Sequence, residues 1–252
     1  MRFFITLSYC GTAYHGWQRQ PHDTSVQEVL EGALSTVLRQ PVAVTGAGRT
    51  DTGVNAAMMV AHFDCDIAIG QKVVHSLNGV LPHDIAVTSI VQVGDDAHAR
   101  FDATSRTYRY LVHHAKSPFM HTHSWFCPHR LDYEMMNRAA ARLLDYTDFT
   151  SFSKLHTDVK TNNCRIDKAC WERQGDMWYF EITADRFLRN MVRAIVGTLV
   201  EVGLGKLTVD GFCRIIEQRN RCCAGTSMPG HALYLWEITY PYPIGTTPPK
   251  PF

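Results

Sequence analysis

Hydrophobic positions in the first half of the chain follow two periods, one typical of strands and one typical of helices. Residues 2–9 alternate loosely between apolar and polar side chains, which predicts a strand. Residues 24–38 instead carry apolar side chains at helical spacing, and Thr24 with Gln27 forms a capping box at the start of this predicted helix. Short apolar or alternating runs predict further strands at 42–44, 58–63, 85–93 and 107–113.

The second half repeats this mixture of periods. Apolar residues at helical spacing predict a helix over 132–144, with Asp132 as its N-cap, and a longer apolar helix over 188–200. Two strand-like runs, 164–173 and 177–184, flank a short loop that contains glycine and predict a hairpin. The predicted pattern is completed by a shorter helix at 208–219 and a last strand at 233–240.

Both halves thus combine strands and helices in a similar order. This pattern predicts an α+β fold in which two related, ferredoxin-like or RRM-like α/β subdomains join into a mixed, mainly antiparallel sheet, with helices on one side and a central cleft. We expect the first subdomain at 1–104 and the second at 105–240. The proline-rich tail 241–252 has no periodicity and is expected to be extended or disordered.

The overall charge gives no sign of a nucleic-acid partner. The 252 residues include 25 Lys plus Arg against 24 Asp plus Glu, a formal net charge of +1, which argues against a protein that binds RNA through global positive charge. The basic residues are nevertheless 18 Arg and only 7 Lys, and the planar guanidinium suits phosphate and base recognition better than an ammonium group. Any RNA-binding surface must therefore arise from local clustering of arginines.

Expectations about location and redox state follow from features that the sequence lacks. The best apolar candidate for a membrane span, 194–205, is interrupted by Glu201, and the amino end lacks the apolar core of a secretory signal, so we expect a cytoplasmic protein. The eight cysteines form no C-x-x-C pair and are expected to be free thiols. Vicinal Cys222 and Cys223 could form a redox pair, which we rank below two unlinked thiols.

The densest group of unusual residues is the segment 46–56, GAGRTDTGVNA. Its glycines and small side chains allow the backbone to approach a ligand, and Arg49 places a guanidinium next to the carboxylate of Asp51. An ionised aspartate in a closed site can act as a nucleophile or a general base. By spacing alone, an Asx-type turn in which Asp51 bonds its own loop is at least as good an explanation.

Two further segments carry arginines in patterns that could bind RNA. On a strand, Arg106 and Tyr108 share one face, and base stacking combined with phosphate contact requires this pairing of residue types. Arg186, Arg189 and Arg193 occur at i, i+3 and i+7 beside the long apolar stripe and could line an anionic groove. Ordinary aromatic packing and a solvated helix flank are the alternatives.

Five histidines fall within 113–129, which raises the alternative of a histidine-based metallohydrolase. The segment contains no H-E-x-x-H motif and no Cys/His quartet with the spacing of a structural zinc site, so a loop with adventitious histidines is favoured. The nucleophile elbow of serine hydrolases and the dinucleotide-binding fingerprint are also missing from the sequence.

These motifs together resemble those of the TruA-type tRNA pseudouridine synthases along most of the chain. Residues 9–20, YCGTAYHGWQRQ, are similar to the amino-terminal motif of that family, and residues 48–54, GRTDTGV, match its most specific signature. The remaining matches follow in family order at 24–34, 77–85, 98–101, 106–110, 148–154 and 187–197.

The resemblance implies an enzyme that isomerises uridine to pseudouridine in the anticodon stem-loop of tRNA, typically at positions 38 to 40. It implies that Asp51 is the catalytic nucleophile, that Tyr108 stacks on the target base and that Arg193 is the basic partner of the aspartate. It further implies a homodimer that binds tRNA across both subunits and uses no metal and no cofactor. We expect Arg49 to contact the substrate, and we expect further RNA contacts from Arg100, Lys154 and Arg189.

The chemistry of the residues agrees with these roles but leaves the route open. Moving a base from nitrogen to carbon attachment needs a group that holds one reaction fragment, and the carboxylate of Asp51 can do so by adding to the base or by attaching to the sugar. The uridine must also be flipped out of its stem, at a cost of a few kcal/mol that stacking on Tyr108 could offset. A catalytically silent RNA-binding module is the alternative function.

Several positions depart from the family pattern. Cys10 replaces an early aspartate, Asn55 stands where a histidine is usual, and Met58 with Met59 replaces a common Gly-Gln pair. Because Asn55 and the methionines are expected to line the Asp51 loop, the resemblance does not determine which tRNAs and which uridines are accepted. With arginines concentrated in the matched segments, the net charge of +1 predicts a strong charge asymmetry between the cleft and the outer surface.

Overall fold

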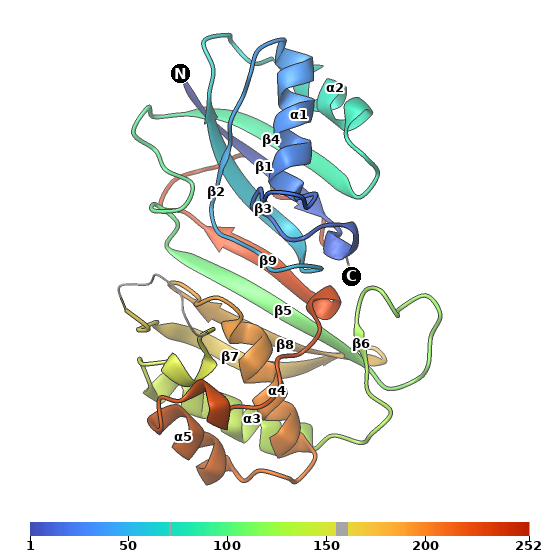
Figure 1. Cartoon of the computed structure of the whole chain (residues 1–252), viewed down its shortest axis with the longest axis vertical. Coiled ribbons are helices and arrows are strands. Elements are labelled where there is room, and N and C mark those ends of the chain that lie inside the picture. The colour runs from blue at the N-terminus through green and yellow to red at the C-terminus, as the bar shows by residue number, and fades with distance from the viewer. Residues whose placement is uncertain (71, 155–160, 252) are drawn as a thin grey trace. The chain divides into compact units, whose positions relative to one another are not determined.

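The computed structural model describes residues 1–70, 72–154 and 161–251, and the chain divides into two compact units. Unit 1 consists of Met1–Thr104 together with Leu235–Phe252, and unit 2 consists of Ser105–Tyr234 (Figure 1). Each unit contains helices and strands, and the strands pair mainly antiparallel with one another. The predicted α+β fold class is therefore confirmed.

The strands of unit 1 are arranged around β1 (Arg2–Tyr9), which pairs antiparallel with both β3 (Asn55–Asp64) and β4 (Ile85–Val93). The two-residue strand β2 (Thr45–Gly46) pairs with β3, and β9 (Leu233–Thr239) is the neighbour of β3 opposite β1. The strands predicted at 2–9, 58–63, 85–93 and 233–240 are thus confirmed, and β3 is longer than predicted.

The strand predicted at 42–44 is wrong, because this backbone bonds to side chains of α1 (Val26–Leu38) instead of to a neighbouring strand. Val44 N–H donates to Glu31 over 3.0 Å, and its carbonyl accepts from Gln27 over 3.0 Å. Val42 N–H donates to Ser35. Side chains on one face of the helix therefore satisfy groups that a sheet would otherwise satisfy.

The helices of unit 1 differ from the prediction in two respects. The N-cap of α1 is Ser25, whose side chain accepts from Glu28 N–H, so the Thr24–Gln27 capping box is wrong by one residue. Thr24 instead accepts a hydrogen bond from His15 N–H through its carbonyl. A second helix, α2 (Lys72–Val80), was not predicted; of its residues only Leu77 is buried. Figure 1 shows both helices on the same face of the strands.

The strands of unit 2 include the predicted hairpin. β7 (Ile166–Gln174) and β8 (Met177–Ala184) are joined by Gly175 and Asp176, and Gly175 has a φ of +59°. β8 also pairs antiparallel with β5 (Ser105–His113), whereas the short strand β6 (Trp125–Phe126) pairs with β5 in parallel. A glycine at the first turn position is what the twist of a tight hairpin requires.

Three α-helices belong to the described part of unit 2. α3 (Tyr133–Ala141) begins at the predicted N-cap Asp132, and α5 (Val209–Glu217) begins at the N-cap Thr208. α4 (Met191–Gly203) is buried at every position except Arg193 and Glu201, which explains its nearly continuous apolar sequence. Short 3-10 helices cover Gly11–Ala13, Arg142–Asp145, Thr150–Phe152, Arg221–Cys223 and Gly230–Ala232.

The proline-rich tail after β9 is bonded to unit 1. The hydroxyl of Tyr242 donates to Asp102 over 2.5 Å, and the ammonium group of Lys250 donates to the carbonyl of Trp236. The rings of Tyr240 and Tyr242 also contact Phe4 of β1, with ring centroids 5.5 and 6.2 Å away. The tail and the residue before it therefore cover part of one face of the central strand.

Among the described residues, no helix combines the length and the apolar character needed to cross a membrane.

Candidate active site

Asp51 lies in unit 1, in the loop between β2 and β3, and is half-buried. A turn forms directly after it, since Val54 N–H donates to the Asp51 carbonyl over 3.1 Å and Gly53 adopts a φ of +75°. The aspartate is thus presented at a fixed backbone position between two strands.

The amino-terminal motif 9–20 holds this loop in place. Trp17 N–H donates to the Thr50 carbonyl over 3.3 Å, and Gly53 N–H donates to the Tyr14 carbonyl over 3.2 Å. The hydroxyl of Tyr9 bonds to the hydroxyl of Thr50 over 2.8 Å in a buried position. Residues on both sides of Asp51 are therefore bonded to the same segment, which explains why the two sequence motifs occur together.

Two glycines of the amino-terminal motif make the close contact possible. A Cβ atom at Gly11 would lie 2.1 Å from the Val54 carbonyl oxygen, and one at Gly16 would lie 2.3 Å from the Thr50 carbonyl oxygen. Gly16 also has a φ of +94°, which side chains rarely tolerate. The position of the Asp51 loop thus depends on the absence of side chains in another segment.

The departures from the family pattern near Asp51 have structural roles. Asn55 is buried, and its side-chain oxygen accepts a hydrogen bond from Gly11 N–H over 2.8 Å. Met58 and Met59 are both buried within β3. The expectation that the two methionines line the loop is therefore wrong, because β3 begins at Asn55 and carries them into the core.

Arg49 does not form the local ion pair considered from the sequence. Its side chain is exposed, and the part of the chain that the structure describes offers it no ion pair or hydrogen bond. Arg49 is thus positioned at the surface of the loop, two residues before the candidate nucleophile.

Tyr108 lies on β5 of unit 2, and its ring packs edge-on against Phe187 with centroids 5.1 Å apart and planes at 85°. The register of β5 against β8 pairs Tyr108 with Ile182 and Tyr110 with Phe180. Arg106 on the same strand donates to the Asp185 carbonyl over 2.9 Å, just before Phe187. The segment after β8 therefore contacts both Arg106 and Tyr108.

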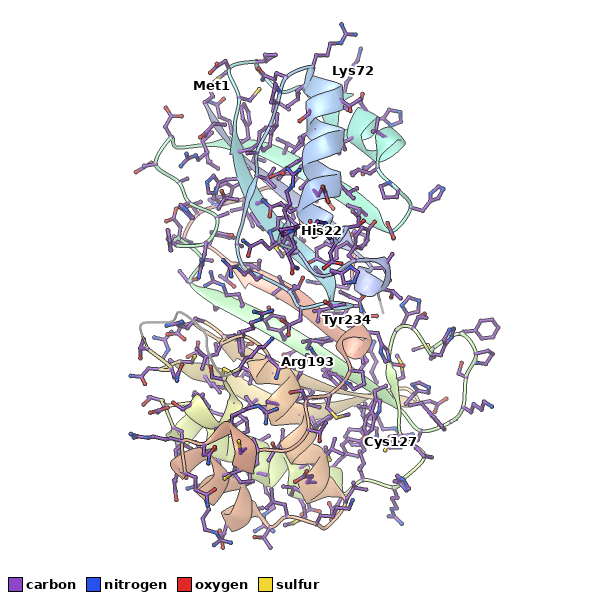
Figure 2. All side chains as sticks on the ribbon, viewed as in Figure 1. Met1, His22, Lys72, Cys127, Arg193 and Tyr234 are labelled. Atoms are coloured by element: carbon purple, nitrogen blue, oxygen red, sulfur yellow. The ribbon has the colours of Figure 1, made fainter. Side chains whose placement is uncertain are left out.

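Arg193 extends from the first turn of α4, where Figure 2 labels it, and is half-buried. Its Nε atom donates to the Met228 carbonyl over 2.5 Å, and Met228 N–H donates back to the Arg193 carbonyl over 3.1 Å. Burial raises the pKa of Tyr110, and the positive charge of Arg193 partly offsets that rise. The guanidinium is thus fixed by a backbone carbonyl and lies close enough to Tyr110 to act on it electrostatically.

The loop that carries Met228 reaches α4 because both partners are small. A Cβ atom at Gly197 would lie 1.9 Å from the Thr226 carbonyl oxygen, and Gly225 N–H donates to Thr198 over 2.9 Å. Arg221 donates to Ser227 over 2.8 Å, which ties the same loop to the preceding segment. These contacts set the position of the carbonyl that holds Arg193.

The predicted helical spacing of three arginines is wrong. Arg186 and Arg189 precede α4, because Asn190 adopts a φ of +66° and forms the N-cap of the helix that begins at Met191. Arg189 is exposed, and its carbonyl accepts from Lys154 N–H over 3.1 Å, so these two candidate RNA contacts lie side by side. The third candidate, Arg100, is exposed in the turn that follows β4 of unit 1.

The histidine-rich segment has bonding partners of its own. Ser124 bonds to His113 over 2.7 Å, and the two ring nitrogens of His114 bond to the Cys127 carbonyl and the Tyr133 hydroxyl. Within the described ranges, no three His, Cys, Asp or Glu side chains are placed to hold a metal ion together. All eight cysteines, the exposed pair Cys222 and Cys223 included, are free thiols.

Several supporting residues were not singled out from the sequence. They are Gly11, Gly16, Tyr9, Thr50, Phe187 and the Met228 carbonyl. All but Thr50 and Met228 lie in segments where the resemblance was noted outside the Asp51 signature, so the motifs themselves were the available signal. A backbone carbonyl such as that of Met228 has no signal in a sequence.

Comparison with known proteins gives a consistent result. The family model described as tRNA pseudouridine synthase matches residues 5–102 and 139–241. The tRNA pseudouridine synthase A of Parabacteroides distasonis is 59% identical over 242 residues, which cover 95% of this chain and 96% of that protein. Its counterpart from Bacteroides thetaiotaomicron is 60% identical over 247 residues, covering 96% and 92%. That of Acetivibrio thermocellus is 40% identical over 239 residues, covering 94% and 98%. The chain therefore belongs to the tRNA pseudouridine synthase family.

Proposed function

We propose that this protein isomerises uridine to pseudouridine in the anticodon stem-loop of tRNA, within positions 38 to 40, with Asp51 as the nucleophile. The observation that carries the proposal is the Asp51 loop, whose backbone is bonded on both sides of the aspartate to the segment 9–17. A carboxylate held at a fixed position is what a nucleophile or a covalent partner requires.

The reaction breaks the bond between N1 of uracil and C1′ of the ribose and forms a bond between C5 and C1′. The proton on C5 is lost, and N1 gains a proton, so the product has the same composition as the substrate. The Asp51 carboxylate holds one fragment during the transfer, through a bond either to the sugar or to the base. Neither route requires a metal ion or an organic cofactor.

Tyr108 and Arg193 have supporting roles in this proposal. Tyr108 stacks on the flipped uracil, which offsets part of the few kcal/mol that unstacking costs. Its edge-on contact with Phe187 limits the orientations of the ring. Arg193 is the basic partner of the catalytic aspartate, and its bond to the Met228 carbonyl orients the guanidinium. Arg49 contacts the substrate near the nucleophile.

Further contacts bring the tRNA backbone to the enzyme. Arg100, Arg189 and Lys154 are exposed, and the backbones of the last two are hydrogen-bonded to one another. They bind phosphates, so each removal lowers tRNA affinity and lowers the dependence of that affinity on salt. The protein acts in the cytoplasm. It is a homodimer, and sedimentation of the purified protein tests this oligomeric state.

The decisive experiment measures tritium released from tRNA labelled at C5 of uridine, with pseudouridine mapping of the same tRNA. The Asp51→Ala variant is expected to lose activity by on the order of 10³-fold or more while it still binds tRNA. Asp66→Ala, at an exposed aspartate after β3, is the matched control and keeps full activity. Undiminished tritium release by Asp51→Ala overturns the role of Asp51. If the wild-type protein binds tRNA but releases no tritium, it is a silent RNA-binding module.

A further inference from the structure

The turn Ala97–Asp102 of unit 1 holds an aromatic ring in solvent. Phe101 has 74% of its surface exposed, although it lies in a turn with many hydrogen bonds. Leaving a phenylalanine ring in water forgoes about 1.5–3 kcal/mol of burial.

The turn is closed by its own side chains. Asp102 N–H donates to the His98 carbonyl over 3.0 Å, and His98 N–H donates to the Asp102 carboxylate over 2.8 Å. The Nδ1 atom of His98 accepts from both Arg100 N–H and Phe101 N–H, at 3.1 and 3.3 Å. The N–H groups of Phe101 and of the residue before it therefore share the His98 imidazole as their acceptor.

Bonds to three other segments of unit 1 fix the turn in space. Arg2 of β1 donates to the Ala97 carbonyl, and His62 of β3 accepts from Ala99 N–H. The hydroxyls of Tyr240 and Tyr242 donate to the Ala99 carbonyl and to Asp102. The Tyr242 hydrogen bond lowers the pKa of Asp102, which keeps this carboxylate ionised as an acceptor. The turn is thus preorganised before any partner arrives.

The ring is accompanied by a cation and a second aromatic group. The imidazole of His98 lies 4.2 Å from the Phe101 ring at 34°, and the Arg100 guanidinium lies 5.8 Å from the ring centroid. An exposed aromatic ring beside a guanidinium matches the stacking and charge requirements of an unpaired nucleobase with its phosphate.

We propose that Phe101 is a stacking platform for an unpaired nucleobase of the bound tRNA. The surface consists of Phe101 and Arg100 on the turn 97–102, and the ring supplies stacking while the guanidinium supplies charge. Because this turn is already rigid, little conformational entropy is lost when the base binds. The inference rests on the proposed function for the identity of the RNA, but it concerns binding and not the isomerisation step.

The test measures tRNA affinity in the Asp51→Ala background, so that its outcome does not depend on turnover. Phe101→Ala is expected to weaken binding roughly 10-fold, whereas Phe101→Trp keeps the affinity because it keeps a stacking surface. The slope of affinity against salt stays unchanged in Phe101→Ala, because the ring carries no charge. Arg100→Gln is expected to reduce that slope. Ile67→Ala, at another exposed apolar residue of unit 1, serves as the control and leaves binding unchanged.

Three results would overturn the proposal. The first is an unchanged affinity in Phe101→Ala, and the second is an equal loss in Phe101→Ala and Phe101→Trp. The third is a changed sedimentation coefficient of Phe101→Ala with unaltered RNA binding, which identifies a contact between copies of this chain. If Phe101→Ala binds tRNA more weakly and the wild-type protein shows no isomerase activity, the stacking platform is supported and only the proposed function is refuted.

Discussion

At the scale of single residues, the candidate site depends on where side chains are absent as much as on where they are present. Gly11 and Gly16 allow the segment 9–17 to approach the Asp51 loop, and Gly197 allows the 224–228 loop to approach α4. In each case the neighbouring atom is a backbone carbonyl oxygen, which cannot rotate away from an added Cβ atom.

Gly16→Ala is therefore expected to destabilise the fold and to displace the Asp51 loop. The new Cβ atom would lie 2.3 Å from the Thr50 carbonyl oxygen, and the residue would have to keep a φ of +94°. We expect a loss of about 2–3 kcal/mol in the free energy of unfolding, measured by urea denaturation, with a lower kcat.

Gly32→Ala is the matched control for this prediction. Gly32 lies within α1, and an added Cβ atom meets no atom within 4 Å. The alanine is expected to raise the free energy of unfolding by about 0.5–1 kcal/mol and to leave activity unchanged. Equal effects of the two substitutions would contradict the close contact at Gly16.

At the scale of secondary structure, the N-cap of a helix is determined by local sequence in some helices and by tertiary contacts in another. Asp132 and Thr208 cap their helices through their side chains, as the local sequence predicts. At α1 the local pattern offers two adjacent hydroxyl residues, and the tertiary contact of Thr24 with His15 decides that Ser25 is the cap.

Ser25→Ala is accordingly expected to lower the free energy of unfolding by about 1 kcal/mol, because Glu28 N–H loses its acceptor. Thr24→Ala removes no side-chain cap, so its effect is expected to stay within about 0.5 kcal/mol. Thermal and urea unfolding of the two variants measure the difference. A larger loss in Thr24→Ala would restore the capping box that the sequence predicts.

At the scale of the whole molecule, a buried histidine connects the sheet of unit 1 to the turn 97–102 and makes stability depend on pH. His62 on β3 has 7% of its surface exposed and accepts from Ala99 N–H. Burial is the main cause that lowers the pKa of His62 to about 4; the neighbouring His98 and Arg2 act in the same direction, and Asp64 and Asp102 oppose them. His62 is therefore neutral in the folded protein at neutral pH.

This pKa shift predicts that the free energy of unfolding decreases as the pH is lowered. Between pH 6.5 and 4 the unfolded chain binds a proton at His62 that the folded chain does not, so the contribution is complete above pH 6.5 and is lost as the pH falls towards 4. We expect the free energy of unfolding to drop by about 2 kcal/mol between pH 7.5 and 5 from this residue. Urea denaturation at both pH values measures the drop.

The His62→Gln variant should abolish that part of the pH dependence, because an amide oxygen can accept from Ala99 N–H without titrating in this range. His129→Gln, at an exposed histidine, should leave the pH dependence as it is in the wild type. Burial also lowers the pKa of His113 and His231, so a smaller dependence is expected to persist in His62→Gln. An unaltered dependence in that variant would contradict the role of His62.

Much of the fold could be predicted because the periodic signals were strong. β1, β4, the β7–β8 hairpin and α4 each carry a long apolar or alternating pattern that leaves one outcome. α2, a nine-residue helix that buries only Leu77, was missed. The strand at 42–44 was wrong because side chains of α1 bond to its backbone.

The sequence by itself determined most element types and the α+β class through the spacing of apolar residues, and its motifs determined the family. The resemblance to that family, and not spacing alone, indicated Asp51, Tyr108 and Arg193 as candidate residues. Tertiary structure alone decided what surrounds them. It placed Asn55 on Gly11 N–H, Met58 and Met59 in the core, Phe187 against Tyr108 and the Met228 carbonyl on Arg193. These contacts join segments far apart in the chain through backbone atoms and shape, and neither leaves a periodic signal in a sequence.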